Sequence, residues 1–200
     1  MRHYQNLSEH GALPPQFVAT CILQILDALV AIHKEGLVHC NLDLDNIMVM
    51  KTPFGGDHFK LVNFDSARIK GSDVHPVFPN AKARLQPFVS PEIAETPLDA
   101  RRKPELSCAA DIWSLGVITF IMRSACLPMN RENNATPADP KAPKFDPEGI
   151  INSAQYGRIF DEDQRDFLIK CMQQDPLKRA TAEELRKHKW IIKNELEVKR

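Results

Sequence analysis

Apolar residues recur with helical spacing in the first long segment of the chain, which runs from Pro14 to about Glu35. A proline pair at 14–15 suits a first helical turn, and Gly36 suits a C-terminal stop. Apolar residues also occupy the other faces, which is typical of a central helix rather than a peripheral one. The main apolar face carries Val18, Cys21, Ile22, Ile25, Leu29 and Ile32.

Three more helices are predicted further along the chain. One spans Leu106 to Met122, and its apolar run from 109 to 122 is too short to cross a bilayer and indicates a buried helix. Another spans about Glu162–Gln174. The last starts at Thr181, where the sequence TAEE forms a capping box.

Short strand-like runs lie between the first two predicted helices. Prolines and glycines within 51–58 predict a hairpin loop, and the five prolines of 128–147 predict an exposed loop. The whole pattern predicts a mainly α chain with a small β element between residues 37 and 65. The strand-like runs are Leu37–His39, Asn46–Met50 and Phe59–Phe64.

Composition narrows the class of protein. The chain has 200 residues, 43% of them hydrophobic and 26% charged, which fits a globular protein of one domain or two small ones. Its 26 basic and 26 acidic residues cancel, so bulk charge gives no support for binding nucleic acid or a membrane. Five scattered cysteines without a CxxC pair exclude a zinc ribbon, and predict reduced thiols in the cytoplasm.

Four short strings carry the chemistry, because they appear in a fixed order along the chain. A late arginine, Arg179, follows them within DPLKRAT. The strings are HCNLDLDN at 39–46, KLVNFD at 60–65, SPE at 90–92 and DIWSLG at 111–116.

These strings resemble the catalytic loop, the D-F-G segment, the A-P-E segment and the D-x-W-S-x-G helix of the C-terminal lobe of a eukaryotic protein kinase. The resemblance covers about residues 8–191 of a single C-lobe unit, 1–200, and it implies a protein-kinase-like C-lobe fold. FVSPE and the segment from 171 to 191 are similar to the calmodulin-kinase group, including the titin- and obscurin-like muscle kinases. The residues to which the resemblance gives structural roles are His39, Phe64, Glu92, Asp111, Trp113 and Arg179, with Glu92 paired to Arg179 and Asp111 bound to catalytic-loop amides.

The same resemblance shows that catalytic groups have been replaced. Asn41 occupies the position of the aspartate that accepts the substrate proton, and a neutral amide cannot give general-base help of about 10²–10⁴-fold. Asn63 occupies the position of the magnesium-binding aspartate and is a poorer ligand for a hard cation. Asn46 still matches the other metal-binding position, whereas Asp65 replaces the D-F-G glycine.

Phosphate handling is altered too. Asp43 stands where Ser/Thr kinases have a lysine that reaches the transferred phosphate, and with Asp45 it makes the loop repel that phosphate. Leu85 lies near the position of the usual substrate-loop threonine. No glycine-rich loop or strand lysine precedes the first helix, so the sequence predicts that the N-lobe is absent.

Three interpretations that give a specific chemical role to individual residues stay open at this point. Asp43, Asp45 or Asp65 could replace the lost carboxylates: the resemblance favours a structural role for Asp45, and Asp65, two residues from Asn63, could bind a cation in an altered geometry. His39 could act as a base, although the resemblance favours a packing role beneath the loop. Cys40 next to it could be a nucleophile, although it is more simply the replacement for the arginine that pairs with a phosphorylated activation loop.

The sequence thus predicts a catalytically inactive, pseudokinase-like C-lobe that serves as a protein-binding or scaffold module with an unknown protein partner. The rival hypothesis is a Ser/Thr kinase that transfers phosphate from ATP to protein, with an N-lobe supplied by a longer chain or a partner. A nonfunctional relic is a third. No cofactor is expected, and ATP and magnesium enter only under the rival hypothesis.

Overall fold

A computed structural model of the chain describes residues 5–6, 12–51, 56–73, 88–94, 105–128 and 146–198. Most of the loop predicted at 128–147, and Leu85, lie outside these described residues. The helices are α1 (Pro15–Lys34), α3 (Pro91–Ala94), α4 (Ala109–Ser124), α5 (Pro147–Ile151), α6 (Glu162–Cys171), α7 (Ala182–Arg186) and α8 (Lys189–Val198). The strands are β1 (Gln5–Asn6), β2 (Leu37–Val38), β3 (Ile47–Lys51), β4 (Asp57–Leu61) and β5 (Arg68–Ile69), and two 3-10 turns are η2 (Leu44–Asn46) and η3 (Phe64–Ser66).

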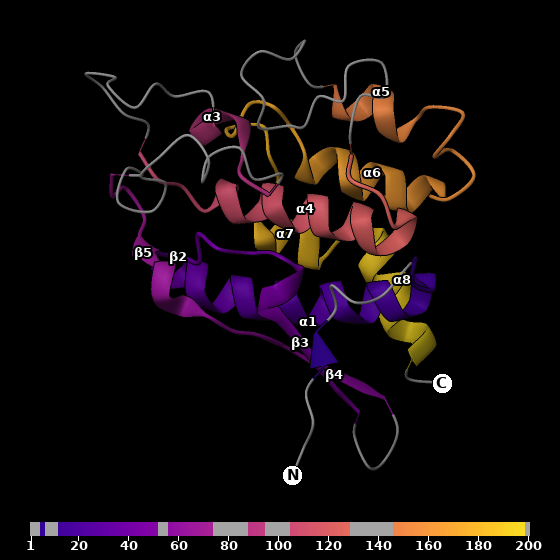
Figure 1. The fold of residues 1–200 in the computed structure, drawn as a ribbon, viewed down its shortest axis with the longest axis horizontal. Helices are drawn as coiled ribbons and strands as arrows, with labels where there is room; N and C mark the ends of the chain where they lie inside the picture. Colours follow the sequence, from indigo (N-terminus) through magenta and orange to yellow (C-terminus); the bar gives the residue numbers. More distant parts are fainter. Residues whose placement is uncertain are drawn as a thin grey trace.

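The described strands form two small antiparallel sheets at the edge of the helical body (Figure 1). In the first sheet β3 pairs with β4, with Ile47 opposite Leu61 and Lys51 opposite Asp57, and β1 adds to the other edge of β3. The second sheet pairs β2 with β5. The predicted hairpin and the mainly α arrangement are confirmed, but the second strand of the hairpin is β4 at Asp57–Leu61 rather than Phe59–Phe64, and Phe64 lies in the turn η3.

Helix α1 lies at the centre of the fold and contacts α4, α7, α8 and the β4 strand. It is preceded by Pro14 and followed by Gly36, whose φ of 71° suits glycine. By length and composition alone α1 could cross a membrane, since its most apolar 18-residue stretch has a mean hydropathy of 1.7. The central helix of a folded core meets the same criterion, and the residues of α1 that are buried in this core are Val18, Ala19, Cys21, Ile22, Ile25, Leu26 and Leu29.

Helix α4 is buried on every side from Ala110 to Phe120. It starts at Ala109, so the predicted start at Leu106 is wrong. Leu106 instead pairs with the chain after β5: the Gly71 amide donates to Leu106 O at 2.8 Å, and the Leu106 amide donates to Ser72 O at 3.0 Å. These hydrogen bonds with residues 71–72 keep Leu106 outside the helix. The apolar residues next to Leu106 in the sequence give no sign of them.

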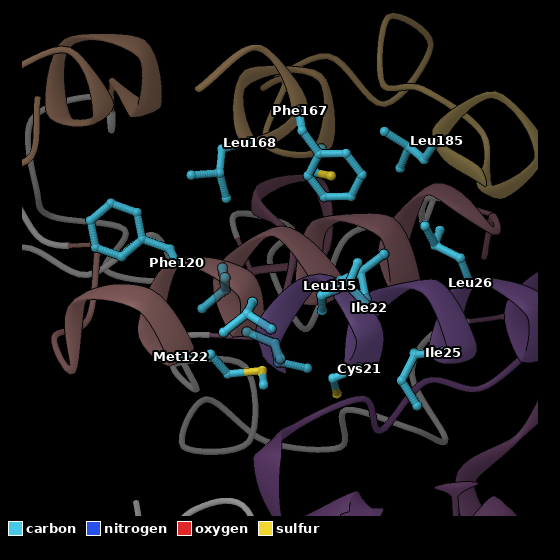
Figure 2. Packing of buried hydrophobic residues seen from close by; sticks show 14 of the residues in the cluster. Cys21, Ile22, Ile25, Leu26, Leu115, Phe120, Met122, Phe167, Leu168 and Leu185 are labelled. Carbon is cyan, nitrogen blue, oxygen red and sulfur yellow. The ribbon is translucent and has the colours of Figure 1, made fainter. Parts of the chain in front are cut away.

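The main core fills the space between α1, α4, α6 and α7. Figure 2 shows Ile22 and Leu26 of α1 and Leu115 of α4 in this cluster, with Phe167 of α6 lying above. Gly116 allows α4 and α6 to come close, because a Cβ there would lie 2.7 Å from the Cβ of Cys171.

The C-terminal part departs from the prediction in its helix ends. Helix α6 ends at Cys171 rather than Gln174. The capping box at Thr181 is present and starts α7. The break before α8 was not predicted, and it falls at His188, whose Nδ1 accepts from the Trp190 amide at 3.2 Å while its Nε2 lies 2.8 Å from Asp166 Oδ2. The short helix α5 was also missed.

Candidate functional site

A single buried carboxylate in the first turn of α4 anchors the loop at 39–46. Asp111, 1% exposed, accepts from the His39 amide at 2.8 Å and from the Cys40 amide at 3.0 Å. His33 of α1 places its Nε2 2.9 Å from the same carboxylate. These bonds offset the cost of burying the charge, and they hold Cys40 at a φ of 64°, which is uncommon for a residue with a Cβ.

His39 is fully buried and braces the loop from below. Its Nε2 donates to Val62 O at 3.1 Å, and its Nδ1 accepts from the Asn41 amide at 3.3 Å. Its ring meets that of Phe64 edge to face, with 4.7 Å between centroids. Both ring nitrogens are engaged with backbone, and burial holds the pKa of His39 below its ordinary value. The geometry fits packing and leaves no nitrogen for general-base work.

The Cys40 side chain packs against a second apolar cluster that includes Val38 and Ile93. Burial, and then the nearby charge of Asp111, raise the pKa of the Cys40 thiol to about 12. The thiolate is the nucleophile in cysteine chemistry, so the geometry gives a nucleophilic Cys40 no support.

Three asparagines meet where the catalytic loop and the D-F-G-like segment come together. Asn46 Nδ2 donates to Asn41 O at 2.8 Å, and Asn63 Nδ2 donates to Asn46 Oδ1 at 3.1 Å. Asn63 has φ and ψ of 64° and 66°, the left-handed region that asparagine tolerates better than most residues. The structure thus brings together all three of the predicted asparagine positions.

The fourth predicted position, Asp43, is turned into the loop rather than left to meet a phosphate. Its Oδ1 accepts from the Asn46 amide at 2.9 Å and caps the turn η2. Burial is the largest influence on Asp43 and raises its pKa, and the charge of Asp45 raises it further, against the Asn46 hydrogen bond that lowers it. Asp45 and Asp65 are both exposed.

The residues present do not fit the magnesium site of a working kinase. Asn46 Oδ1, the oxygen that would face a metal, already accepts from Asn63, and the carboxylate expected at position 63 is missing. Among the described residues, no group of three or more His, Cys, Asp and Glu side chains could hold a metal ion. The donor set is therefore two neutral amides, which suit a hard dication poorly.

The remaining predicted residues form a buried cluster below the loop. The guanidinium of Arg179 donates from Nη1 and Nη2 to Glu92 Oε1 and Oε2, both at 2.9 Å, in a bidentate pair. Nη1 also donates to Ala109 O at 2.7 Å, and Nε to Gln173 O at 3.0 Å. The ring of Trp113 lies 5.1 Å from the guanidinium carbon. This cluster ties α3 and α4 to the loop before α7.

Two polar residues of α1 that matter here were missed from the sequence. His33 reaches Asp111, and Gln24 pairs with β4, donating to Asp57 O at 3.0 Å and accepting from the Phe59 amide at 2.9 Å. The signal was present, because a polar side chain within a helix that is apolar on nearly all faces needs a buried partner.

The mainly helical fold and the carboxylate-anchored loop together define a protein-kinase-like lobe. The comparison with known families agrees: residues 1–191 match the protein kinase domain family, and the chain belongs to it.

Curated relatives are similar to this chain over most of its length. They include protein kinase kin1 of Schizosaccharomyces pombe, 26% identical over 92% of the chain, and calcium/calmodulin-dependent protein kinase cmkB of Emericella nidulans, 26% identical over 94%. Human death-associated protein kinase 2 is 28% identical over 94%. The chain spans 18%, 44% and 47% of the lengths of these three relatives, respectively.

Solved structures agree on the fold. The crystal structure of the Rad53 kinase domain and SCD2 superposes with a TM-score of 0.69 at 23% identity, covering 96% of this chain and 63% of that one. The same pair in complex with AMPPNP gives a TM-score of 0.66 at 22% identity.

Proposed function

We propose that this chain is a pseudokinase-like module that binds a protein partner and does not transfer phosphate. The observation that carries the proposal is the state of the loop at 39–46. Its anchor on Asp111 is complete, whereas the expected base, phosphate lysine and D-F-G aspartate are replaced by Asn41, Asp43 and Asn63, and only Asn46 keeps a matching metal-binding position.

The missing groups act on different parts of the reaction. Asn41 cannot accept the proton of a substrate hydroxyl. Asp43 replaces the lysine that would contact the phosphate, and its negatively charged carboxylate is turned into the loop by the Asn46 amide. Asn63 offers an amide N–H where a metal would need an anionic oxygen. No single one of these changes is decisive alone, but their joint presence removes base, metal ligand and phosphate contact together.

The same geometry supports the absence of a bound nucleotide–metal complex. A ligand that binds only the folded state raises stability by about 2.7 kcal/mol at a hundredfold excess over its dissociation constant. We expect ATP with magnesium to leave the melting temperature of this chain unchanged. A clear upward shift would contradict this part of the proposal.

Exposed apolar side chains support a protein partner. Ile69 is 68% exposed and Leu177 is 94% exposed, and Phe64 beside the loop is 44% exposed. Covering exposed apolar side chains with another protein surface removes apolar area from water, which favours association. The zero net charge gives no reason to propose nucleic acid or a membrane, and the five free cysteines suit a reducing compartment such as the cytoplasm.

The test is a phosphorylation assay of the purified chain with labelled ATP, magnesium or manganese, and a broad peptide library. The proposal expects incorporation equal to that of a buffer blank and of an Asn41→Ala variant. Transfer well above the blank that disappears in the variant would overturn it.

The rival function, a Ser/Thr protein kinase, is favoured by the names of the relatives, which are kinases. It requires an N-lobe from a longer chain or a partner to cover the nucleotide. An in-frame glycine-rich loop and strand lysine upstream in the transcript would raise this rival, and the same assay on the longer chain would decide between the two.

A further inference from the structure

The loop at 39–46 meets the segment at 63–66 through the rings of His39 and Phe64 and through a hydrogen bond between two side-chain amides. Asn46 is only 7% exposed and uses both ends of its amide: Nδ2 donates to Asn41 O at 2.8 Å, and Oδ1 accepts from Asn63 Nδ2 at 3.1 Å. The Asn46 backbone amide is taken by Asp43. We call the chain of bonds from Asn63 through Asn46 to Asn41 the amide ladder.

The step of the amide ladder from Asn46 to the Asn41 carbonyl lies within the loop, whereas the step that joins the two segments depends on the amide at position 63. A carboxylate there would place an acceptor oxygen against Asn46 Oδ1, and two acceptors at hydrogen-bond distance repel each other unless a cation or a proton lies between them. Asparagine supplies the N–H that removes this conflict. It also adopts the left-handed conformation at a φ of 64° at low cost, so local preference and the ladder agree.

We propose that the amide ladder takes the place of a bridging cation and keeps the two segments together whether or not a divalent ion is present. The inference rests on the proposed function in one respect: without a nucleotide–metal complex, the buried Asn46 Oδ1 needs a partner other than a metal ion, and Asn63 supplies it. The substitution Asn63→Asp should then make the stability of the chain depend on a divalent cation, whereas the stability of the wild type should not depend on one.

The experiment measures melting temperature for the wild-type chain and for Asn63→Asp, in EDTA and with millimolar Mg²⁺, Mn²⁺ or Ca²⁺. The wild type should melt at the same temperature in all four. Asn63→Asp should melt lower in EDTA by about 3–6 °C, since it loses a hydrogen bond and gains a repulsion. The divalent ions should recover most of that loss.

Two further variants separate the ladder from general effects. Asn152→Asp adds the same charge at an exposed residue outside the site and should not respond to cations. Asn63→Leu removes the donor without adding a charge, and it should lower the melting temperature and stay indifferent to cations. Electron paramagnetic resonance of Mn²⁺ gives a direct second reading, with bound ion expected for Asn63→Asp and none for the wild type.

The proposal is overturned if the wild type gains stability from the ions as much as Asn63→Asp does, or if Asn63→Asp behaves like Asn152→Asp. These readings need no activity, so they are independent of the phosphorylation assay. Phosphoryl transfer with an indifferent wild-type melting curve would overturn the proposed function and leave the amide ladder standing.

Discussion

The bidentate pair between Arg179 and Glu92 offers the most direct measurement of how strongly the scaffold is held. The Arg179 side chain is fully buried, and that of Glu92 is 19% exposed. In Glu92→Gln the shape is kept, but one acceptor oxygen becomes an NH₂ group that faces a guanidinium N–H. The arginine charge stays buried, with the neutral carbonyls of Ala109, Gln173 and Gln174 and the ring of Trp113 around it.

The expected cost follows from the burial. Removing one partner of a buried ion pair typically costs 3–5 kcal/mol, because an uncompensated charge is left behind. We expect the lower end, about 3 kcal/mol, because the backbone carbonyls remain as acceptors. For a chain of this size that corresponds to a fall of about 6–12 °C in melting temperature.

The assay is urea denaturation followed by far-ultraviolet circular dichroism. Glu183→Gln is the matched control, since it makes the same change in the Lys34–Glu183 pair, whose side chains are 62% and 52% exposed. Exposed pairs contribute about 0–1 kcal/mol. Adding Arg179→Met to Glu92→Gln should recover part of the loss. The reasoning is refuted if Glu92→Gln costs no more than Glu183→Gln.

Three other changes test separate parts of the fold. Gly116→Ala should cost about 1–3 kcal/mol in urea denaturation, because the new methyl would lie 2.7 Å from Cys171 Cβ, and a loss near zero would refute the close packing of α4 on α6. Thr181→Ala should cost about 1 kcal/mol through loss of the α7 capping box, and an unchanged midpoint would contradict it. Burial lowers the pKa of His39, so the unfolded chain binds the proton first and stability should fall as the pH drops through 6.5 towards the folded-state pKa. His39→Gln should flatten that pH dependence of the melting temperature, and an equally steep curve in the variant would rule His39 out as its source.

The large elements could be predicted from the sequence because their patterns are local and strong. Helix α1 is predicted by a proline at its start, a glycine after its end and apolar residues on nearly every face. The start of α4 could not be predicted, since Leu106 is fixed by backbone bonds to Gly71 and Ser72, far away along the chain. The break before α8 likewise depends on His188 meeting Asp166 of α6.

The candidate site also has a part that could be predicted from the sequence and a part that could not. The motif strings predict the positions of Asn41, Asn46 and Asn63, and elementary chemistry predicts the loss of base and metal ligand. The amide ladder itself was out of reach, because it depends on the relative placement of two residues seventeen positions apart. A spacing in sequence indicates which residues can meet, but only the fold decides which atom of an amide faces which.

Stability alone explains how the buried residues of the scaffold can be kept while the residues at the catalytic positions change. Asp111 and Arg179 are buried charges that bond to backbone groups and to the partly buried side chains of His33 and Glu92, so replacing either one leaves unpaired groups at a cost of several kcal/mol. The positions that carry chemistry lie nearer the surface: Asn63 is exposed and Asn41 is partly exposed, and an amide there finds new hydrogen bonds at little cost. A chain under pressure only to stay folded would keep the first set and lose the second. An intact Asp111 anchor therefore indicates that the fold is kept, and it does not indicate activity. Activity has to be judged from the residues at Asn41, Asp43 and Asn63.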